Sequence, residues 1–393
     1  LTILYITPLK ALARDIAQAI RRPLDDLGWP IEVDLRTGDT TATARRRFKE
    51  RLPHVLVTTP ESLAILMTDQ GWEDRMHGVQ AIILDEWHEL MGTKRGVQVE
   101  LALSRLKALN PNLVVWGISA TIGNIGEAMD VLLGTHTTRH TMVRANLRKE
   151  IVTETMFPEE IEKFPWGGHL GIKLMDKVLE VIHSSRSTLM FTNTRAQCEI
   201  WYQRLLEQDP SLAGQMALHH GSLGDEVRQW VENALHEGIL KVVVCTSSLD
   251  LGVDFRPVDT VIQVGSPKGV ARFMQRAGRS GHQPGAVSKI WFLPTHSLEI
   301  VEGAALREAV DAGIMETRIP YIRSFDVLIQ YMVTLAVSEG FTSNELFQEV
   351  VSTHCFASVS REEFDWCLSF ITHGGQLLDA YDEFHKVVVE DGR

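Results

Sequence analysis

Cysteine is scarce in this 393-residue chain, and the four cysteines stand apart from one another. They are Cys198, Cys245, Cys355 and Cys367, and they form no CxxC pair and no ligand-spaced set with histidine. A structural zinc site is therefore not expected, because such sites need closely spaced thiolate and imidazole ligands. Sparse, unpaired cysteines fit a reducing, cytoplasmic compartment.

Long apolar runs and an excess of positive charge are absent as well. No apolar stretch approaches the roughly 20 residues of a transmembrane helix, so we expect no contact with a membrane. The formal net charge of −12 argues against a protein that coats nucleic acid through bulk charge. A local basic groove stays compatible with this charge, because a handful of residues is enough for phosphate contacts.

The beginning of the chain has neither an initiator methionine nor the basic region of a signal peptide. It starts Leu1-Thr2-Ile3-Leu4-Tyr5-Ile6, which already has the pattern of a core strand. We therefore expect the sequence to be a fragment.

What the sequence does contain is a regular alternation of buried strands and helices. Strands are predicted over 1–7, 31–36, 54–58, 79–84 and 113–118, and again over 187–191, 215–219, 241–246, 260–264 and 288–293. Alternation at this spacing is typical of doubly wound parallel sheets, so the predicted fold class is α/β with two such domains. We place the first domain at 1–142, a linker at 143–170 and the second domain at 171–315.

The strand alternation stops near residue 321. Helical patterns cover 324–338, 342–351 and 360–373, and the segments 376–380 and 386–389 are predicted to form a short hairpin. Three helices followed by a two-stranded wing describe a winged-helix domain, here 321–393. Such domains bind nucleic acid, bind proteins, or brace a neighbouring domain. The acidic residues near the wing favour bracing, because phosphate contacts require positive charge.

The acidic stretch that follows the strand at 79–84 is the strongest candidate for a chemical site. Asp85 and Glu86 come directly after three apolar residues, at the end of a strand where ligand sites of α/β sheets lie. An aspartate that holds Mg²⁺ and a glutamate that polarises water make up the acidic half of a nucleoside triphosphatase site. Taken alone, the pair fits a solvated acidic turn better than a catalytic site, because charged turn residues are usually just solvated.

Several other strands end in a helix start that suits phosphate binding. Pro8 and Lys10 open one helix, and Thr59-Pro60-Glu61-Ser62 opens another. An ordinary amphipathic helix explains the Lys10 face as well as phosphate binding does. The basic run at 45–51 fits a solvated helix face better than a nucleic-acid patch.

The order of the short motifs is more specific than any one of them. TPLKAL, TTPESL, DEWHEL, SAT, FTNTR, HHGSL, TSSLDLGVDF and QRAGRSGH follow one another along the chain. In this order the sequence resembles the superfamily-two helicases, with two RecA-like domains. KRGVQVELALSRL and PTHSLEIVEGAALREAV resemble the large helicase-related family within them. PWGGH and SPKGVARFMQRAGRSGH resemble its ligase-associated branch, which acts in the DNA-damage response.

The resemblance implies roles in ATP hydrolysis for a small set of residues. Asp85 would hold Mg²⁺, Glu86 would orient and deprotonate the attacking water, and His88 would couple this site to Ser119 and Thr121. From the second domain, Arg279 would act as arginine finger and Gln275 would lie beside the γ-phosphate or the water. Gly252 and Asp254 would contact the nucleotide, the latter near its sugar.

The resemblance also implies a track for single-stranded or tailed DNA. The contacts would come from Pro8, Lys10, Thr59, Pro60 and Glu61 in the first domain and from Thr194, Arg195, His220, Thr246 and Ser247 in the second. Their hydroxyl and N–H groups can hold phosphates without reading bases. The family pattern implies ATP-driven movement 3′ to 5′ in DNA repair, and the branch implies a DNA ligase or nuclease as partner.

Two features depart from the wider superfamily pattern. The finger motif ends with His282 where many members have a second arginine, so no finger role is assigned to it. No G-x-x-x-x-G-K-[ST] phosphate loop is present, and it is expected in a unit before Leu1. We therefore expect the chain by itself to hydrolyse ATP poorly. A nucleic-acid-binding module without ATPase activity and an RNA-remodelling helicase remain alternatives.

Overall fold

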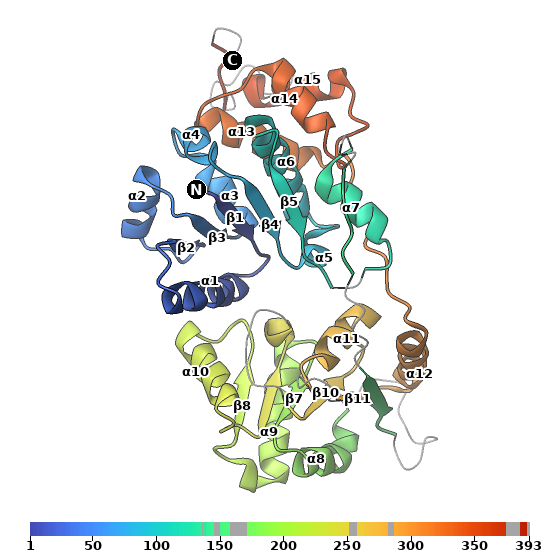
Figure 1. Cartoon of the computed structure of the whole chain (residues 1–393). Coiled ribbons are helices and arrows are strands. Elements are labelled where there is room, and N and C mark those ends of the chain that lie inside the picture. Colours follow the sequence, from blue (N-terminus) through green and yellow to red (C-terminus); the bar gives the residue numbers. More distant parts are fainter. Residues whose placement is uncertain are drawn as a thin grey trace. The chain divides into compact units, whose positions relative to one another are not determined.

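The computed structural model describes residues 1–393 with the exception of 121, 136, 138, 145–149, 158–170, 251–257, 282–286, 375–385 and 391–393. The chain divides into two compact units. The first comprises Leu1–Met142 together with Thr317–Arg393, and the second comprises Val143–Glu316. Each unit is built on one parallel β-sheet (Figure 1), which confirms the predicted α/β class.

The sheet of the first unit consists of parallel strands in the order β2-β3-β1-β4-β5. Their bounds are β1 (Ile3–Ile6), β2 (Val33–Arg36), β3 (Val55–Thr58), β4 (Ala81–Leu84) and β5 (Val114–Gly117). Leu4, Ile6 and Leu56 on the central strands are fully buried, as expected for strands covered on both faces. Because β1 lies between β3 and β4, the ends of these three strands meet at one edge of the sheet.

Helices connect the strands and cover the sheet (Figure 1). They are α1 (Lys10–Asp26), α2 (Ala42–Glu50), α3 (Pro60–Leu66), α4 (Trp72–Met76), α5 (Trp87–Leu90), α6 (Lys94–Leu109) and α7 (Ile125–Leu133). Thr93 caps α6 by accepting a hydrogen bond from the N–H of Gly96 at 3.2 Å. Helix α6 is buried along most of its length, and even its polar residues Glu100 and Arg105 are buried.

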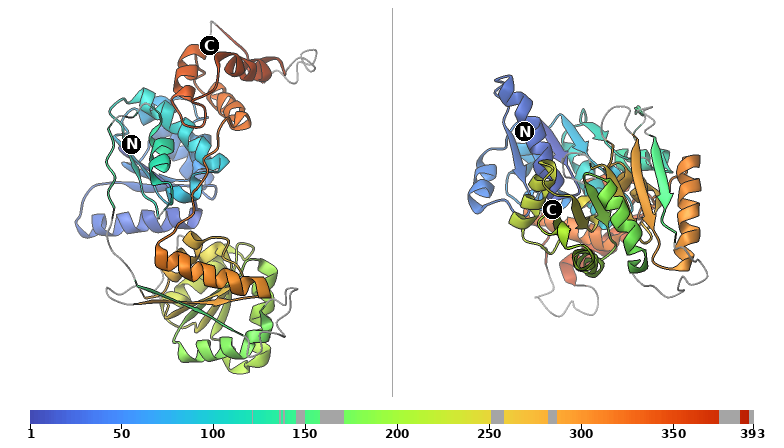
Figure 2. Two further views of the ribbon diagram at one scale, coloured as in Figure 1. Left: turned by 90° about the vertical axis from the view of Figure 1, so that its right-hand side faces the viewer. Right: turned by 90° about the horizontal axis from the view of Figure 1, so that it is seen from below.

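The carboxyl-terminal helices belong to the same unit (Figures 1 and 2). They are α13 (Phe325–Val337), α14 (Ser343–Val351) and α15 (Arg361–His373), in agreement with the three predicted helices. Helices α13 and α14 pack against α6, and α15 packs on α13. Leu328 and Phe356 share one apolar core with Leu4 of the sheet. Of the predicted wing, 376–380 lies outside the described residues, and 386–389 is not in a strand.

Charged groups also tie these helices to the first sheet domain. Arg105 on α6 donates from Nη2 to Glu73 on α4 and from Nη1 to Glu349 on α14, each at 2.7 Å. Glu100 accepts a hydrogen bond from the main-chain N–H of Cys355 at 3.0 Å. These buried contacts agree with a bracing role for the winged helix.

The sheet of the second unit consists of parallel strands in the order β6-β11-β10-β7-β9-β8. Their bounds are β6 (Ile151–Thr155), β7 (Thr188–Phe191), β8 (Met216–His219), β9 (Val242–Cys245), β10 (Thr260–Val264) and β11 (Ser288–Leu293). The connecting helices are η2 (Ile172–Leu174), α8 (Met175–Ser184), α9 (Arg195–Gln208), η3 (Pro210–Leu212), α10 (Asp225–His236), η4 (Ser247–Leu249), α11 (Val270–Ala277) and α12 (Ser297–Ala312).

Strand β6 lies inside the segment 143–170, for which a linker was predicted. It pairs in parallel with β11, with Ile151 opposite Ser288 and Thr155 opposite Phe292. The second unit therefore begins before residue 171. The sequence IVTET was not recognised because it forms an edge strand whose residues are all half-buried, and such a strand lacks the apolar run that marks a central one. Within the described part of the chain, no helix has the length and apolarity needed to span a bilayer.

Candidate functional site

The acidic pair lies at the carboxyl end of β4, in the middle of the first sheet. The Asp85 N–H donates to the Ile6 carbonyl of β1 at 2.9 Å, which extends the β-ladder by one residue. Its carboxylate is held on both sides. The hydroxyl of Tyr5 donates to Oδ2 at 3.1 Å, and the N–H of Glu86 donates to Oδ1 at 2.9 Å. Burial raises the pKa of Asp85 above its usual value, although both hydrogen bonds act in the opposite direction.

Glu86 has a backbone conformation that non-glycine residues rarely adopt. Its φ of 49° and ψ of 45° lie in the left-handed region, at a cost of about 1–3 kcal/mol for a residue with a side chain. Such strain persists only where neighbouring structure enforces it, and here α5 begins at the next residue. The turn places the Glu86 side chain, 24% exposed, beside that of His88.

His88 connects the end of β4 to the end of β5. Its Nδ1 accepts a hydrogen bond from the Ala120 N–H at 3.3 Å and lies 3.3 Å from Ser119 Oγ. Its Nε2 lies 3.6 Å from a carboxylate oxygen of Glu89. Burial lowers the pKa of His88. In the neutral ring Nδ1 accepts from the Ala120 N–H, which can only donate, so the ring proton is on Nε2, on the side of Glu89. The predicted partner Ser119 is therefore beside His88, whereas Thr121 lies outside the described residues.

The donor set at this site fits Mg²⁺ bound together with a nucleotide. No group of three or more potential metal-ligating side chains is present in the described part of the chain. Mg²⁺ does not require such a group, because it commonly binds through one or two carboxylates, phosphate oxygens and retained waters. The Asp85 carboxylate, oriented by Tyr5 and the Glu86 N–H, would supply the single protein ligand.

The nucleic-acid candidates of the first unit lie at the ends of β1 and β3. Arg95, which the sequence did not single out, joins them: its guanidinium pairs with Glu61 and donates from Nη2 to the Pro8 carbonyl at 2.6 Å. Burial alone would raise the pKa of Glu61, but its hydrogen bonds, above all to Arg95, hold it below the usual value. Lys10 pairs with Asp39 at 2.6 Å, and both side chains are about half exposed.

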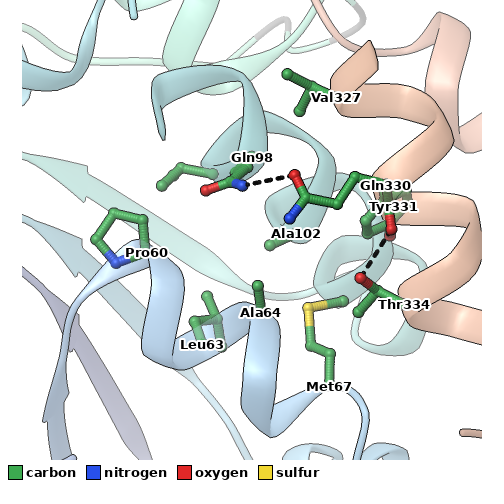
Figure 3. A pocket seen from close by; sticks show the side chains of 11 residues that line it. Pro60, Leu63, Ala64, Met67, Gln98, Ala102, Val327, Gln330, Tyr331 and Thr334 are labelled. Atoms are coloured by element: carbon green, nitrogen blue, oxygen red, sulfur yellow. Dashed lines mark hydrogen bonds between the residues drawn. The ribbon is translucent and has the colours of Figure 1, made fainter. Parts of the chain in front are cut away.

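Thr59 and Pro60 are buried, in contrast to Lys10 and Glu61. Pro60 lines a pocket bounded by α3, α6 and α13, where Gln98 donates to Gln330 at 3.2 Å (Figure 3). Pro60, for which a DNA contact was predicted, thus lies in a pocket that helix α13 of the winged helix also lines. The Thr59 hydroxyl donates to Ser62 Oγ at 3.2 Å.

The nucleic-acid candidates of the second unit lie at the ends of the neighbouring strands β7, β9 and β8. Thr194 caps α9 by accepting from the Gln197 N–H at 3.2 Å. Arg195 is exposed, and its Nη1 lies 3.4 Å from Ser222 Oγ. Burial lowers the pKa of His220. Thr246 and Ser247 begin the short helix η4 at the end of β9, so the structure brings the five residues to one edge of this sheet.

Gln275 and Arg279 lie on and just after α11, next to a buried polar cluster that the sequence did not predict. Arg276 is 2% exposed and donates from Nε and Nη2 to the Asp250 carboxylate at 2.7 and 3.0 Å. Its Nη1 donates to Gln263 Oε1 at 2.5 Å. Arg279 Nη2 donates to the main-chain oxygen of Asp250 at 2.7 Å. Asp250 therefore holds both arginines of the motif.

Besides Thr121, three residues named from the sequence lie outside the described residues, namely Gly252, Asp254 and His282. The only signal for Asp250 and Arg276 in the sequence is their presence inside the motifs TSSLDLGVDF and QRAGRSGH. Nothing in those motifs says that these two side chains are paired and buried.

Comparisons with known families agree with this arrangement. Residues 1–128 match the DEAD/DEAH box helicase model, residues 172–283 the helicase conserved C-terminal domain, and residues 308–393 the winged helix domain of the large helicase-related protein. These matches define the class as a superfamily-two helicase core followed by a winged helix, as predicted.

Individual relatives specify the family. The ATP-dependent helicase Lhr-Core of Methanocaldococcus jannaschii is 31% identical over 100% of this chain and 47% of its own length. The Lhr helicase/uracil glycosylase of Escherichia coli is 32% identical over 94% of this chain and 27% of its own. The solved structure of Mycobacterium smegmatis helicase Lhr bound to ssDNA and AMP-PNP matches with a TM-score of 0.83 and 31% identity, over 94% of this chain and 50% of that one. The chain therefore belongs to the large helicase-related family. It spans slightly less than half the length of the Lhr-Core relatives that it matches.

Proposed function

We propose that this chain is the motor of an ATP-dependent helicase that moves along single-stranded DNA. The observation that carries the proposal is the geometry at the end of β4. Asp85 is oriented from two sides, Glu86 is held in a strained turn, and His88 bonds to the end of β5. Fixed groups of this kind suit phosphoryl transfer, whose catalysis rests on positioning and charge stabilisation.

In this proposal each group has a defined task. Asp85 would hold Mg²⁺, which would supply positive charge against the phosphates, and Glu86 would accept the proton of the attacking water. His88 transmits the state of this site to Ser119. Arg279 supplies positive charge to the transition state, with Gln275 beside the γ-phosphate or the water.

The predicted nucleic-acid residues support a track that grips phosphates rather than bases. Lys10 and Arg195 supply positive charge, while Thr194, Thr246 and Ser247 supply hydroxyl and N–H groups at helix starts. The relative from Mycobacterium smegmatis was solved with ssDNA and AMP-PNP, which supports both ligands for this chain. Movement 3′ to 5′, a role in DNA repair, and a ligase or nuclease partner belong to the same proposal, and their support is the resemblance of the motifs.

The experiment is ATP turnover by the full-length protein with and without single-stranded DNA. We expect DNA-stimulated hydrolysis, and a decrease of about 100-fold or more in kcat for Glu86→Gln, because a general base contributes about 10²–10⁴ in rate. Glu237→Gln, on an exposed turn after α10, is the matched control and should turn over ATP like the wild type. Equal turnover by Glu86→Gln and the wild type would refute the assignment. A DNA strand and an RNA strand of one sequence, tested side by side, distinguish the two substrates through the 2′-OH.

A further inference from the structure

The segment in which the chain passes from the second unit to the first is anchored on both sides. The passage falls between Glu316 and Thr317. Each anchoring contact lies within one unit, and the residues that hold the passage, Glu316, Arg318 and Asn124, have no role assigned to them in the site described above.

On the side of the second unit, Glu316 caps the helix that leads to Arg279. Its two carboxylate oxygens accept hydrogen bonds from the N–H groups of Val270 and Ala271, the latter at 2.9 Å. These N–H groups belong to the first turn of α11 and have no partner within the helix. A carboxylate there also complements the helix dipole. Gly269, with a φ of 147°, makes room, because a Cβ at that position would lie 2.6 Å from Glu316 Oε1.

On the side of the first unit, the Asn124 side chain clamps Arg318. Asn124 Oδ1 accepts from the Arg318 N–H, and Asn124 Nδ2 donates to the Arg318 carbonyl, both at 2.9 Å. Asn124 is the N-cap residue directly before α7, a few residues after Ser119. A two-bond clamp of this kind fixes the direction of the chain as well as its position.

Ile319, the residue after Arg318, lies close to Gly92, which follows the acidic motif DEWHEL. A Cβ at Gly92 would lie 2.6 Å from the Ile319 carbonyl oxygen, and Gly92 has a φ of 73°. The Arg318 guanidinium also lies 3.9 Å from Glu89 on α5. Residues 318 and 319 are therefore held against both segments that follow the site, the one after Glu86 and the one after Ser119.

We propose that residues 316–319 form a coupling strap, in which Glu316 and Arg318 act as positioning residues for the two halves of the ATPase chemistry. Only two peptide units separate these anchors, so their Cα atoms lie no more than about 7 Å apart. If α11 moves, the strap therefore transmits the movement to α7 and α5, because so short a segment cannot change its length to compensate. The roles of Arg279 and Glu86 rest on the proposed function. The existence of the strap is inferred from the hydrogen bonds and close approaches of residues 316–319 alone.

Hydrogen exchange tests the strap without any need for ATP hydrolysis. In the full-length protein, Asn124→Ala should accelerate exchange of the Val270 and Ala271 amides about fivefold or more, the lower end of usual coupling effects. The matched control is Thr41→Ala, which removes a cap from α2 in the same unit and should leave these amides unchanged. Exchange at α11 that is the same in Asn124→Ala and the wild type would overturn the proposal.

A second measurement addresses the motor. Gly-Ser-Gly-Ser inserted between Thr317 and Arg318 keeps both anchors and adds slack, so base pairs unwound per ATP should fall about fivefold while DNA-stimulated hydrolysis continues. The same insertion after the exposed Gly238, where an added Cβ would meet no atom within 4 Å, is the control. An undiminished ratio would count against the strap. A wild-type protein that hydrolyses no ATP would instead refute the proposed function, and the exchange experiment would still decide on the strap.

Discussion

Glu100 is a buried carboxyl group where helix α6 meets the winged helix, and it makes the packing of the two testable. It is 5% exposed and accepts hydrogen bonds from the main-chain N–H groups of His354 and Cys355. Burial outweighs these bonds and raises the pKa of Glu100 from 4.5 to about 8. At neutral pH the group is therefore protonated in the folded protein and ionised in the unfolded one.

The sign of the effect follows from this difference. Between pH 4.5 and 8 the folded state binds the additional proton, so the free energy of unfolding falls as pH rises through this window. The full contribution is present below pH 4.5 and is lost above pH 8. At about 1.36 kcal/mol per pH unit, the change in the free energy of unfolding across this window is roughly 5 kcal/mol. This is an upper limit, because local opening that lets water reach Glu100 would reduce the change.

Glu100→Gln removes the titration and keeps an oxygen that can accept from the Cys355 N–H. The variant should match the wild type near pH 4.5 and become progressively more stable than it up to pH 8, with a constant difference above that. Urea unfolding of the first unit at several pH values measures this. The control is Glu50→Gln on the exposed end of α2, which should stay within about 0.5 kcal/mol at every pH. A difference that does not change with pH would refute the assignment of a protonated Glu100 at this junction.

Three further changes test other contacts. Tyr5→Phe removes the hydrogen bond to Asp85 and should weaken Mn²⁺ binding with nucleotide about 10–100-fold, as seen by electron paramagnetic resonance; unchanged affinity would exclude a role for Tyr5 in orienting the carboxylate. Arg105→Met leaves two half-buried carboxylates without their partner and should lower the urea-unfolding free energy by up to about 3–5 kcal/mol; a loss below about 1 kcal/mol would show that water reaches the site. Arg279→Lys should reduce ATP turnover about 10³-fold or more while nucleotide binding, followed by fluorescence titration, persists; wild-type turnover would exclude a finger role.

Many of the strands could be predicted from short apolar patterns in the sequence. Runs such as Val242–Cys245 are fully buried strands, and they were recognisable because a strand covered on both faces must be apolar throughout. Strand β6 escaped recognition because its alternation of Ile, Val, Thr and Glu reflects an edge position that depends on its neighbour β11.

The sequence by itself determined that Asp85 and Glu86 follow a strand, because three apolar residues precede them. It also supplied the ordered motifs that mark the family. Tertiary structure alone decided that Tyr5 holds Asp85, that Asp250 holds Arg276, and that Asn124 clamps Arg318. Each of these pairs joins residues distant in sequence, and a hydrogen bond forms only where packing brings donor and acceptor to about 3 Å. Periodicity along the chain reports which face of an element is buried, but it does not report what that face meets.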